Sequence, residues 1–291
     1  MMHKWDTDRD AGLVTPENVV RFDHISYGEY GVWNLLDVYR PKQDTEKRLP
    51  VIVSVHGGGW VYGDKDVYQH YCMSLAQRGF VVVNFSYRLS PDVVYPGHLQ
   101  DVNAAMGWVT DHIAEYGGDE SHMYLVGDSA GAQMAAMYAC VLTNPDCRTR
   151  LGMEAVPDVK IRAVALSCGA YDMEDCLRRV DAGASEAEQE ELLRTVLGEA
   201  YGAEQLFLGC PAHFITKDFP PAYVMSSNGD FLRNQQPILL DALKQKGILH
   251  EYHEYGDETE TLYHVFHCNI RLDAARKCND EVCSFFRKHI K

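Results

Sequence analysis

The chain has 291 residues, of which 46% are hydrophobic and 24% are charged, a composition that supports a sizeable core and excludes an intrinsically disordered protein. Its formal net charge is −15 at pH 7, which argues against binding to nucleic acid or to an anionic membrane, because both would repel an acidic surface. No apolar run reaches the roughly eighteen residues that a membrane-spanning helix needs, and the polar start of the chain predicts no signal peptide.

The nine cysteines of the chain show no paired spacing, which argues against a disulfide framework. No Cys-x-x-Cys sequence occurs, so a zinc site or a thioredoxin-type redox site is not expected. Most of the cysteines have apolar neighbours and are predicted to be buried as small hydrophobic side chains. This usage suits a reducing compartment, and we predict a cytoplasmic protein that needs no metal and no cofactor.

The predicted elements follow a polar N-terminal segment. Residues 1–24 show no clear period and are expected to lie over the surface. Residues 33–39 alternate apolar and polar side chains, which predicts an antiparallel strand near the edge of a sheet. Further strands are predicted from short apolar or alternating runs at residues 51–55, 80–85, 122–126, 161–167, 222–226 and 250–255.

Helices are predicted between these strands, at residues 68–77, 99–115, 130–142, 236–246 and 273–290. Gly79 and Gly247 follow two of them at the position where a left-handed residue ends a helix. Strands and helices therefore alternate, which indicates an α/β protein with a mostly parallel sheet that is covered by helices on both faces.

Residues 171–219 interrupt this alternation because they are too many for a simple crossover between two strands. A capping box begins at Ser185, and apolar residues at helical spacing follow between residues 192 and 200. Residues 172–209 hold ten acidic and three basic side chains. One interpretation is a surface helix on the crossover, but a cap over the active site is favoured, because an insertion here emerges at the ligand-binding edge of the sheet. We predict one domain, residues 1–291, with residues 171–219 as a cap insertion.

Two glycine-rich motifs follow predicted strands. Residues 127–131, Gly-Asp-Ser-Ala-Gly, lie between the strand at 122–126 and a helix, which is the setting of a nucleophile elbow and makes Ser129 the candidate nucleophile. Residues 56–59, His-Gly-Gly-Gly, follow the strand at 51–55 and offer bare backbone N–H groups to an oxyanion. The alternative is two ordinary turns of an α/β protein, which the order of the motifs and their places at strand ends disfavour.

A serine hydroxyl needs a histidine base, and the histidine needs an orienting carboxylate. In this architecture the chain order is serine, then acid, then histidine. Asp230 is the best candidate acid, because it occupies the loop after the strand at 222–226. Asp257 and Glu258 compete for this role, but they follow the next strand, where the histidine is expected. The alternative role for Asp230 is that of a turn or helix-cap residue.

His264 is the best candidate base, because it lies beyond the last strand in the loop that leads to the final helix. His267 is a rival three residues further on. His253 is a weaker candidate, since it lies inside the predicted strand at 250–255.

The oxyanion hole follows from the elbow rule, which takes one N–H from the residue after the nucleophile and another from the glycine run. The predicted donors are therefore Ala130, Gly58 and Gly59, with Gly57 as an alternative. His56 is expected to hold the loop by hydrogen bonds to the backbone, and Asp128 is expected to point away from the nucleophile. Trp60 is predicted to line the substrate pocket, with a place in the core as the alternative.

These motifs closely resemble the α/β-hydrolase superfamily, in particular the branch of hormone-sensitive-lipase-like carboxylesterases and acetyl esterases. The resemblance runs from about residue 51 to residue 264 and implies Ser129 as nucleophile, Asp230 as acid and His264 as base. Its further motifs are Gly63-Asp64, residues 87–91, Pro96 with Asp101, and residues 229–232. The chain departs from the family in two places, with His-Val-Phe at residues 264–266 and Ala132 at the end of the elbow motif.

From these features we expect a serine hydrolase that cleaves short-chain, acetyl-type carboxylic esters through an acyl-enzyme. Its partner would be a small-molecule ester, and a homodimer is compatible with the sequence. Trp60 followed by Gly63-Asp64 resembles members that act on short acyl esters of sugars or on aryl formamides, so an arylformamidase-like amide hydrolase is one alternative. A non-catalytic ligand-binding protein on a hydrolase scaffold is the other.

Overall fold

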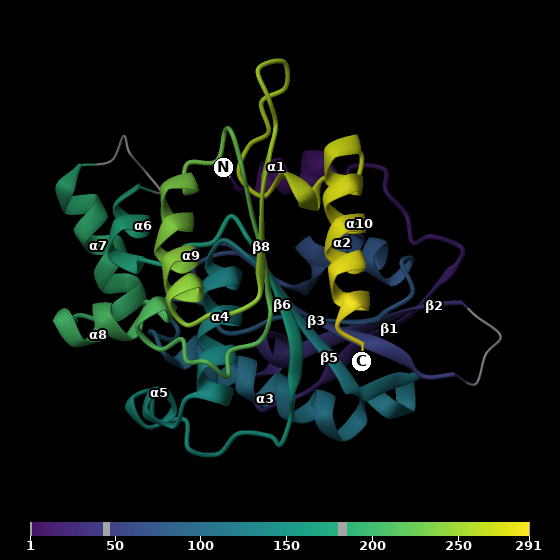
Figure 1. Ribbon diagram of the computed structural model, residues 1–291, viewed down its shortest axis with the longest axis horizontal. Coiled ribbons are helices and arrows are strands. Elements are labelled where there is room, and N and C mark those ends of the chain that lie inside the picture. The colour runs from purple at the N-terminus through teal and green to yellow at the C-terminus, as the bar shows by residue number, and fades with distance from the viewer. Residues whose placement is uncertain (1, 43–46, 180–184, 291) are drawn as a thin grey trace.

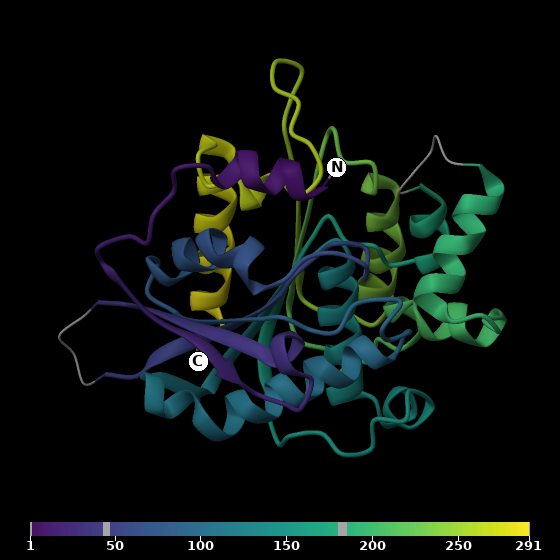
Figure 2. The same cartoon turned by 180° about the vertical axis from the view of Figure 1, so that it is seen from behind.

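The computed structural model describes residues 2–42, 47–179 and 185–290, which form an eight-stranded sheet with helices on both faces (Figures 1 and 2). The spatial order of the strands is β1-β2-β4-β3-β5-β6-β7-β8. The strands are β1 (Val19–Ser26), β2 (Leu35–Pro41), β3 (Leu49–Val55), β4 (Val81–Phe85), β5 (Gly118–Asp128), β6 (Ile161–Ser167), β7 (Ala222–Ser227) and β8 (His250–Tyr255). β1, β2 and β4 pair antiparallel, whereas β4, β3 and all later strands pair parallel.

The described helices are α1 (Met2–Asp10), α2 (Lys65–Ala76), α3 (Gly97–His112), α4 (Ala130–Thr143), α5 (Pro145–Arg150), α6 (Met173–Arg179), α7 (Glu186–Leu197), α8 (Ala203–Leu208), α9 (Gln236–Gln245) and α10 (Asp273–Lys288). None of them is long and apolar enough to cross a membrane. All nine cysteines are free and buried, which confirms their predicted place as small hydrophobic side chains in the interior.

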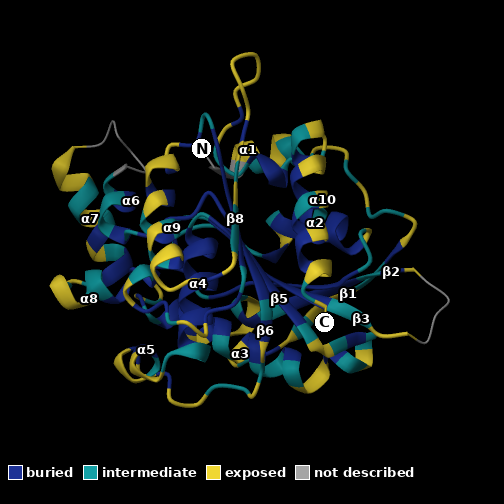
Figure 3. Cartoon of the chain, viewed as in Figure 1, coloured by how far each residue is buried: buried dark blue, intermediate teal, exposed yellow. Residues whose placement is uncertain are grey.

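Each face of the sheet carries its own hydrophobic core because successive side chains of a strand point to opposite faces. In β3, Val51, Val53 and Val55 pack with α3, α4 and α9. Ile52 points the other way and packs with α2 and α10. The central strands are buried on both sides, as Figure 3 shows, and this explains why their sequences are continuous apolar runs. The predicted α/β architecture with a mostly parallel sheet is confirmed.

The N-terminal segment lies over the surface as predicted, and it also forms two elements that its sequence did not indicate. Residues 1–24, which show no apolar period, contain α1 and most of β1. β1 is an edge strand that pairs with β2 through its backbone, so most of its side chains stay in contact with water and show no apolar alternation. α1 is attached by polar contacts, in which Arg9 donates to the Val67 carbonyl and Tyr62 donates to Asp6.

Helix α4 lies directly against the end of β3. A Cβ atom added to Gly131 in the first turn of α4 would lie 2.1 Å from the carbonyl oxygen of Val55 and 2.5 Å from that of His56. Two backbones approach this closely only where no side chain stands between them. The helix after β5 is thereby held against the strand that precedes residues 56–59.

Replacing Gly131 with Ala should therefore destabilise the fold. We expect the free energy of unfolding to fall by about 1–3 kcal/mol, because backbone atoms rather than a flexible side chain must move. Gly107→Ala is the matched control, since Gly107 lies inside α3 with no atom within 4 Å of an added Cβ. That change should raise stability by about 0.5–1 kcal/mol. Urea unfolding of both variants checks the prediction, and equal effects would contradict it.

Candidate active site

Ser129 occupies a tight turn between β5 and α4. Its backbone has φ 53° and ψ −121°, a conformation that non-glycine residues rarely adopt and that marks a strained turn. A Cβ atom added to Gly127 would lie 2.3 Å from the carbonyl oxygen of Gly131, so the two glycines allow the turn to close. The Ser129 amide donates to the carbonyl of Ser167 at the end of β6, at 2.9 Å, which fixes the turn at the carboxyl edge of the sheet.

Asp230 and His264 form a hydrogen-bonded pair in the loops after β7 and β8. The distance from His264 Nδ1 to Asp230 Oδ1 is 2.6 Å. Asp230 also accepts from Ser226 Oγ at 2.7 Å and from the amide of Leu232 at 2.9 Å. Burial alone would raise the pKa of Asp230, but these hydrogen bonds and the nearby imidazole hold that pKa below its ordinary value. The carboxylate is thus held charged and aimed at the imidazole.

Ser129 and this pair meet at one edge of the sheet, because β5, β6 and β7 are neighbours. Cys168 lies between them. It directly follows Ser167, whose carbonyl accepts the hydrogen bond from the Ser129 amide. Its sulfur lies within 4.8 Å of a carboxylate oxygen of Asp230 and of a ring nitrogen of His264. In the described part of the chain no hydrogen bond joins the Ser129 hydroxyl to His264. Such bonds often tighten only when substrate is bound.

The competing acids and His253 lie apart from this pair. Residues 256–261, which include Asp257 and Glu258, form an exposed loop that projects from the carboxyl edge of the sheet (Figures 1 and 3). Asp257 accepts hydrogen bonds from residues of its own loop. His253 lies within β8, where its ring stacks on Tyr223 at a centroid distance of 4.7 Å.

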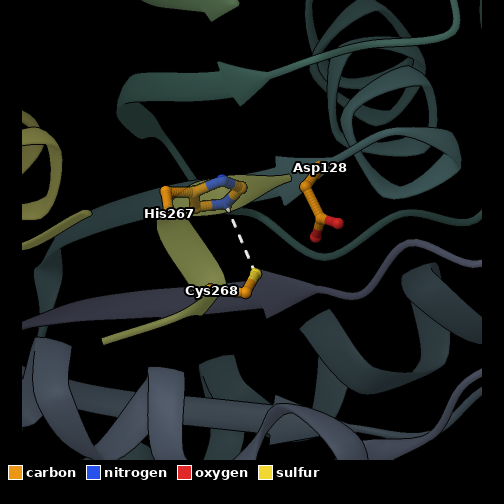
Figure 4. A group of neighbouring side chains, drawn as sticks. All are labelled: Asp128, His267 and Cys268. Atoms are coloured by element: carbon orange, nitrogen blue, oxygen red, sulfur yellow. Dashed lines mark hydrogen bonds between the residues drawn. The ribbon is translucent and has the colours of Figure 1, made fainter. Parts of the chain in front are cut away.

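His267, the rival base, is buried next to Asp128 and Cys268 (Figure 4). Its Nε2 lies 3.6 Å from Cys268 Sγ, and its ring meets the edge of Tyr71 at 5.2 Å. Burial lowers the pKa of His267 to about 3, so the imidazole is neutral near pH 7. The structure gives it no bond to Asp230, whose hydrogen-bonded imidazole is that of His264.

Among the residues that the structure describes, two groups of side chains bring metal-binding atoms within 4.8 Å of one another. The first consists of Asp128, His267 and Cys268, a carboxylate, imidazole and thiol set of the kind that suits Zn²⁺. The second consists of Cys168 with Asp230 and His264, and the last two already satisfy each other through their hydrogen bond.

The glycine loop after β3 exposes two backbone amides. Gly58 and Gly59 have φ 120° and 61°, and within the described residues neither of their N–H groups nor that of Ala130 has an acceptor. The Gly57 amide, in contrast, donates to the Tyr68 hydroxyl at 3.0 Å. The candidate glycine donors from the sequence are Gly57, Gly58 and Gly59. Of these, Gly58 and Gly59 have N–H groups that are available to an oxyanion.

His56 and Trp60 fix the two ends of this loop. His56 Nδ1 lies 2.8 Å from the Gly57 carbonyl and its ring stacks on Tyr87 at 4.0 Å, so the expected bond from His56 to backbone is present. Burial lowers its pKa to about 4. Trp60 is only 1% exposed and belongs to the core between the sheet and α3 and α4. The structure therefore favours the alternative interpretation of Trp60, a core tryptophan.

Asp128 joins the elbow to the glycine loop. Its Oδ2 accepts from the Tyr68 hydroxyl at 2.7 Å, and the same hydroxyl accepts from the Gly57 amide. Burial raises the pKa of Asp128 to about 6. Sequence reasoning missed Tyr68, because a tyrosine on the buried face of a helix has the same pattern as any core aromatic residue.

Sequence reasoning also missed Phe231, which directly follows Asp230. Its ring is 45% exposed and lies 4.4 Å from the His264 ring, centroid to centroid. Its place next to the predicted acid, within the motif at residues 229–232, was the available signal.

Residues 171–219 lie beside the elbow helix, and residues 180–184 of this segment lie outside the described residues. Its helices α6, α7 and α8 gather at one side of the molecule next to α4 and α9 (Figures 1 and 2). Gln133, one turn after Ser129, donates to the Gly209 carbonyl at 2.8 Å, and Tyr95 donates to the Leu208 carbonyl at 3.0 Å. The segment is thus attached to the helix that carries the candidate nucleophile at its start.

Two surface cavities have volumes suited to small molecules. One, of about 420 Å³, borders the loop after Trp60 and is lined by Trp33, Val61, Tyr62 and Leu89 and by acidic residues that include Asp6 and Asp64. The other, of about 440 Å³, lies at the opposite edge of the sheet, near Ile161 and Pro221 at the starts of β6 and β7. Neither of these two is lined by Ser129, Asp230 or His264.

Comparison with known proteins shows that the chain is similar to esterases. The model of the BD-FAE family matches residues 36–242. The probable carboxylic ester hydrolase LipM of Mycobacterium tuberculosis is 35% identical over 228 residues, which cover 76% of this chain and 51% of LipM. The versiconal hemiacetal acetate esterase of Dothistroma septosporum is 29% identical over 219 residues, 71% of this chain and 64% of that protein.

The crystal structure of esterase B from Lactobacillus rhamnosis superposes with a TM-score of 0.87 at 24% identity, covering 99% of this chain and 91% of that one. This likeness shows a shared fold. The chain spans about half the length of LipM and 64% of the Dothistroma esterase.

Replacing Asp128 with Asn should remove a pH-dependent loss of stability. Burial raises the pKa of Asp128 from 3.8 to about 6, so the folded state retains a proton that the unfolded state releases between these values, and stability falls as the pH rises through them. The loss near pH 7 is about 3 kcal/mol, because each pKa unit is worth about 1.4 kcal/mol.

Asn carries no charge and still offers an oxygen to the Tyr68 hydroxyl. We therefore expect the variant to gain up to about 3 kcal/mol relative to wild type between pH values of about 4 and 7. Urea unfolding of both proteins at the two pH values measures this change. A constant difference between the two proteins would contradict the prediction.

Proposed function

Because the chain belongs to the BD-FAE family, in the hormone-sensitive-lipase-like carboxylesterase branch of the α/β-hydrolases, we propose that it is a serine esterase for short-chain, acetyl-type carboxylic esters. The observation that carries the proposal is the 2.6 Å bond between His264 and Asp230 at the edge of the sheet where Ser129 lies on its strained turn. An acid, a base and a nucleophile in this arrangement suit acyl transfer.

In the proposed mechanism the Ser129 hydroxyl attacks the ester carbonyl while His264 Nε2 takes its proton. Asp230 holds the other ring nitrogen and stabilises the cationic imidazole. The amides of Ala130, Gly58 and Gly59 donate to the oxyanion of the tetrahedral intermediate. His264 then delivers its proton to the leaving alcohol, and water releases the acyl group by the same steps in reverse. The residues named supply every proton transfer in this sequence.

The preference for short acyl groups is supported by one relative and by the position of residues 171–219. The Dothistroma relative is named as an acetate esterase, and residues 171–219 stand beside the elbow helix, where they would restrict the length of the acyl chain. An arylformamidase-like activity would instead hydrolyse N-formyl aryl amines faster than acetyl esters, so a side-by-side assay of the two substrates separates these functions.

Ser129→Ala should abolish hydrolysis of acetyl esters and leave the fold intact. Loss of a triad serine lowers turnover by ~10⁶, and the Ser129 side chain makes no hydrogen bond within the described residues that its removal would break. Turnover of p-nitrophenyl acetate and labelling by a fluorophosphonate probe measure the loss of activity, and the melting temperature shows whether the fold is intact. A variant that keeps more than about a thousandth of wild-type turnover would assign the nucleophile to another residue.

The two neighbouring histidines supply a matched comparison for this experiment. His264→Ala should be nearly as damaging to turnover as Ser129→Ala, whereas His267→Ala should retain turnover at temperatures where it stays folded, with its effect seen as lower stability from a buried void. The reverse ranking of turnover would move the base to His267.

Esters that carry a carboxylate should be cleaved more slowly than neutral esters of the same shape. Residues 172–209 hold ten acidic and three basic side chains, and the exposed loop at residues 256–261 adds Asp257, Glu258 and Glu260 at the carboxyl edge of the sheet. These charges should create a negative field that repels anions. We expect a several-fold lower kcat/KM for a hemisuccinate than for its neutral isostere.

Salt supplies the control for this prediction, because exposed charges are screened over about 8–10 Å at physiological ionic strength. The difference in kcat/KM between the two esters should become smaller as salt is added. Equal rates at low salt would show that the acidic side chains face away from the substrate.

A further inference from the structure

We propose that Phe231 forms the subsite for the leaving alcohol, and that this subsite favours uncharged esters of aromatic alcohols. The inference rests on the proposed function, because it concerns the side of the site to which His264 delivers its proton. It goes further by naming the chemical class of the alcohol and the residue that selects it.

Phe231 is an exposed aromatic side chain in contact with the proposed base. Its ring is 45% exposed, although burying such a ring would stabilise the fold by about 1.5–3 kcal/mol. Its centroid lies 4.4 Å from that of the His264 ring, with an angle of 49° between the planes. The adjoining backbone is fixed, since the Leu232 amide donates to Asp230 and the Leu232 side chain is buried. The exposed ring is therefore held in a defined place.

The chemistry of ester cleavage determines which part of the substrate reaches this ring. The carbonyl oxygen must face the amides of Ala130, Gly58 and Gly59, and the carbonyl carbon must meet the Ser129 hydroxyl. The leaving oxygen must come within about 3 Å of His264 to accept its proton. The group bonded to that oxygen consequently lies beside the imidazole, where Phe231 offers an apolar face.

A second exposed aromatic residue stands on the other loop of this edge. Tyr263 directly precedes His264 and is 61% exposed. Its backbone is bound to the loop after β7, because its carbonyl accepts from Ser227 Oγ at 3.2 Å and it forms a bridge with Gly229. The Phe231 face beside the imidazole favours a flat apolar group, since aromatic pairs add about 0.5–1.5 kcal/mol beyond the area that they bury.

The test uses two acetates with alcohols of similar size and acidity, benzyl acetate and cyclohexylmethyl acetate. Phe231→Ala should lower kcat/KM for the benzyl ester about 3–10-fold more than for the cyclohexylmethyl ester, as expected for the loss of an aromatic contact. Benzyl alcohol should inhibit the wild-type enzyme more strongly than the variant. Phe22→Ala is the matched control, because Phe22 is a partly exposed aromatic residue on the edge strand β1. This change should leave the ratio of the kcat/KM values for the two esters unchanged.

The remaining outcomes overturn the inference in distinguishable ways. If Phe231→Ala lowers kcat/KM equally for both esters, Phe231 acts on His264 alone and selects no alcohol. Unchanged rates for both esters would show that the alcohol lies elsewhere. If the wild-type protein hydrolyses neither ester and Ser129 is not labelled by a fluorophosphonate, the proposed function itself fails and the alcohol subsite fails with it.

Discussion

The contact between α4 and the end of β3 is the constraint on which the site depends. An added Cβ on Gly131 would fall 2.1 Å from the Val55 carbonyl oxygen, so the helix and the strand touch backbone to backbone. This contact places the turn that carries Ser129 beside the loop that carries Gly58 and Gly59. The candidate nucleophile and oxyanion donors thus share one rigid junction, and substrate need not bring them together.

A second connection runs through Tyr68, which helix α2 brings from the opposite face of the sheet. Its hydroxyl accepts from the Gly57 amide and donates to Asp128, the residue before Ser129. Because this bond occupies the Gly57 amide, the next two amides of the loop are the ones left without an acceptor within the described residues. The charge state of Asp128 enters the same network, since burial brings its pKa to about 6, and a protonated Asp128 would present a different set of hydrogen bonds to the loop.

Much of the fold was predictable because the buried parallel strands are continuous apolar runs between helical segments, and the gathering of Ser129, Asp230 and His264 at one edge follows from their places after β5, β7 and β8. The roles of these three residues stay predictions. The features that could not be predicted depend on contacts between residues distant along the chain. β1 is defined by its pairing with β2, and the roles of Tyr68 and Phe231 depend on their contacts with Asp128 and His264. The sequence around Trp60 was compatible with a place in the substrate pocket or in the core, and only its packing in the structure shows that it lies in the core.

The nine buried thiols have a consequence for what happens once the native packing is lost. Burial raises the thiol pKa of Cys140, Cys168 and Cys268 well above the ordinary range, so these groups are inert while the chain is folded. Unfolding would expose all nine at once with ordinary acidity, and random cross-links between chains would then compete with refolding. Heat inactivation in air should accordingly be irreversible and grow with protein concentration, whereas a reductant should restore recovery on cooling.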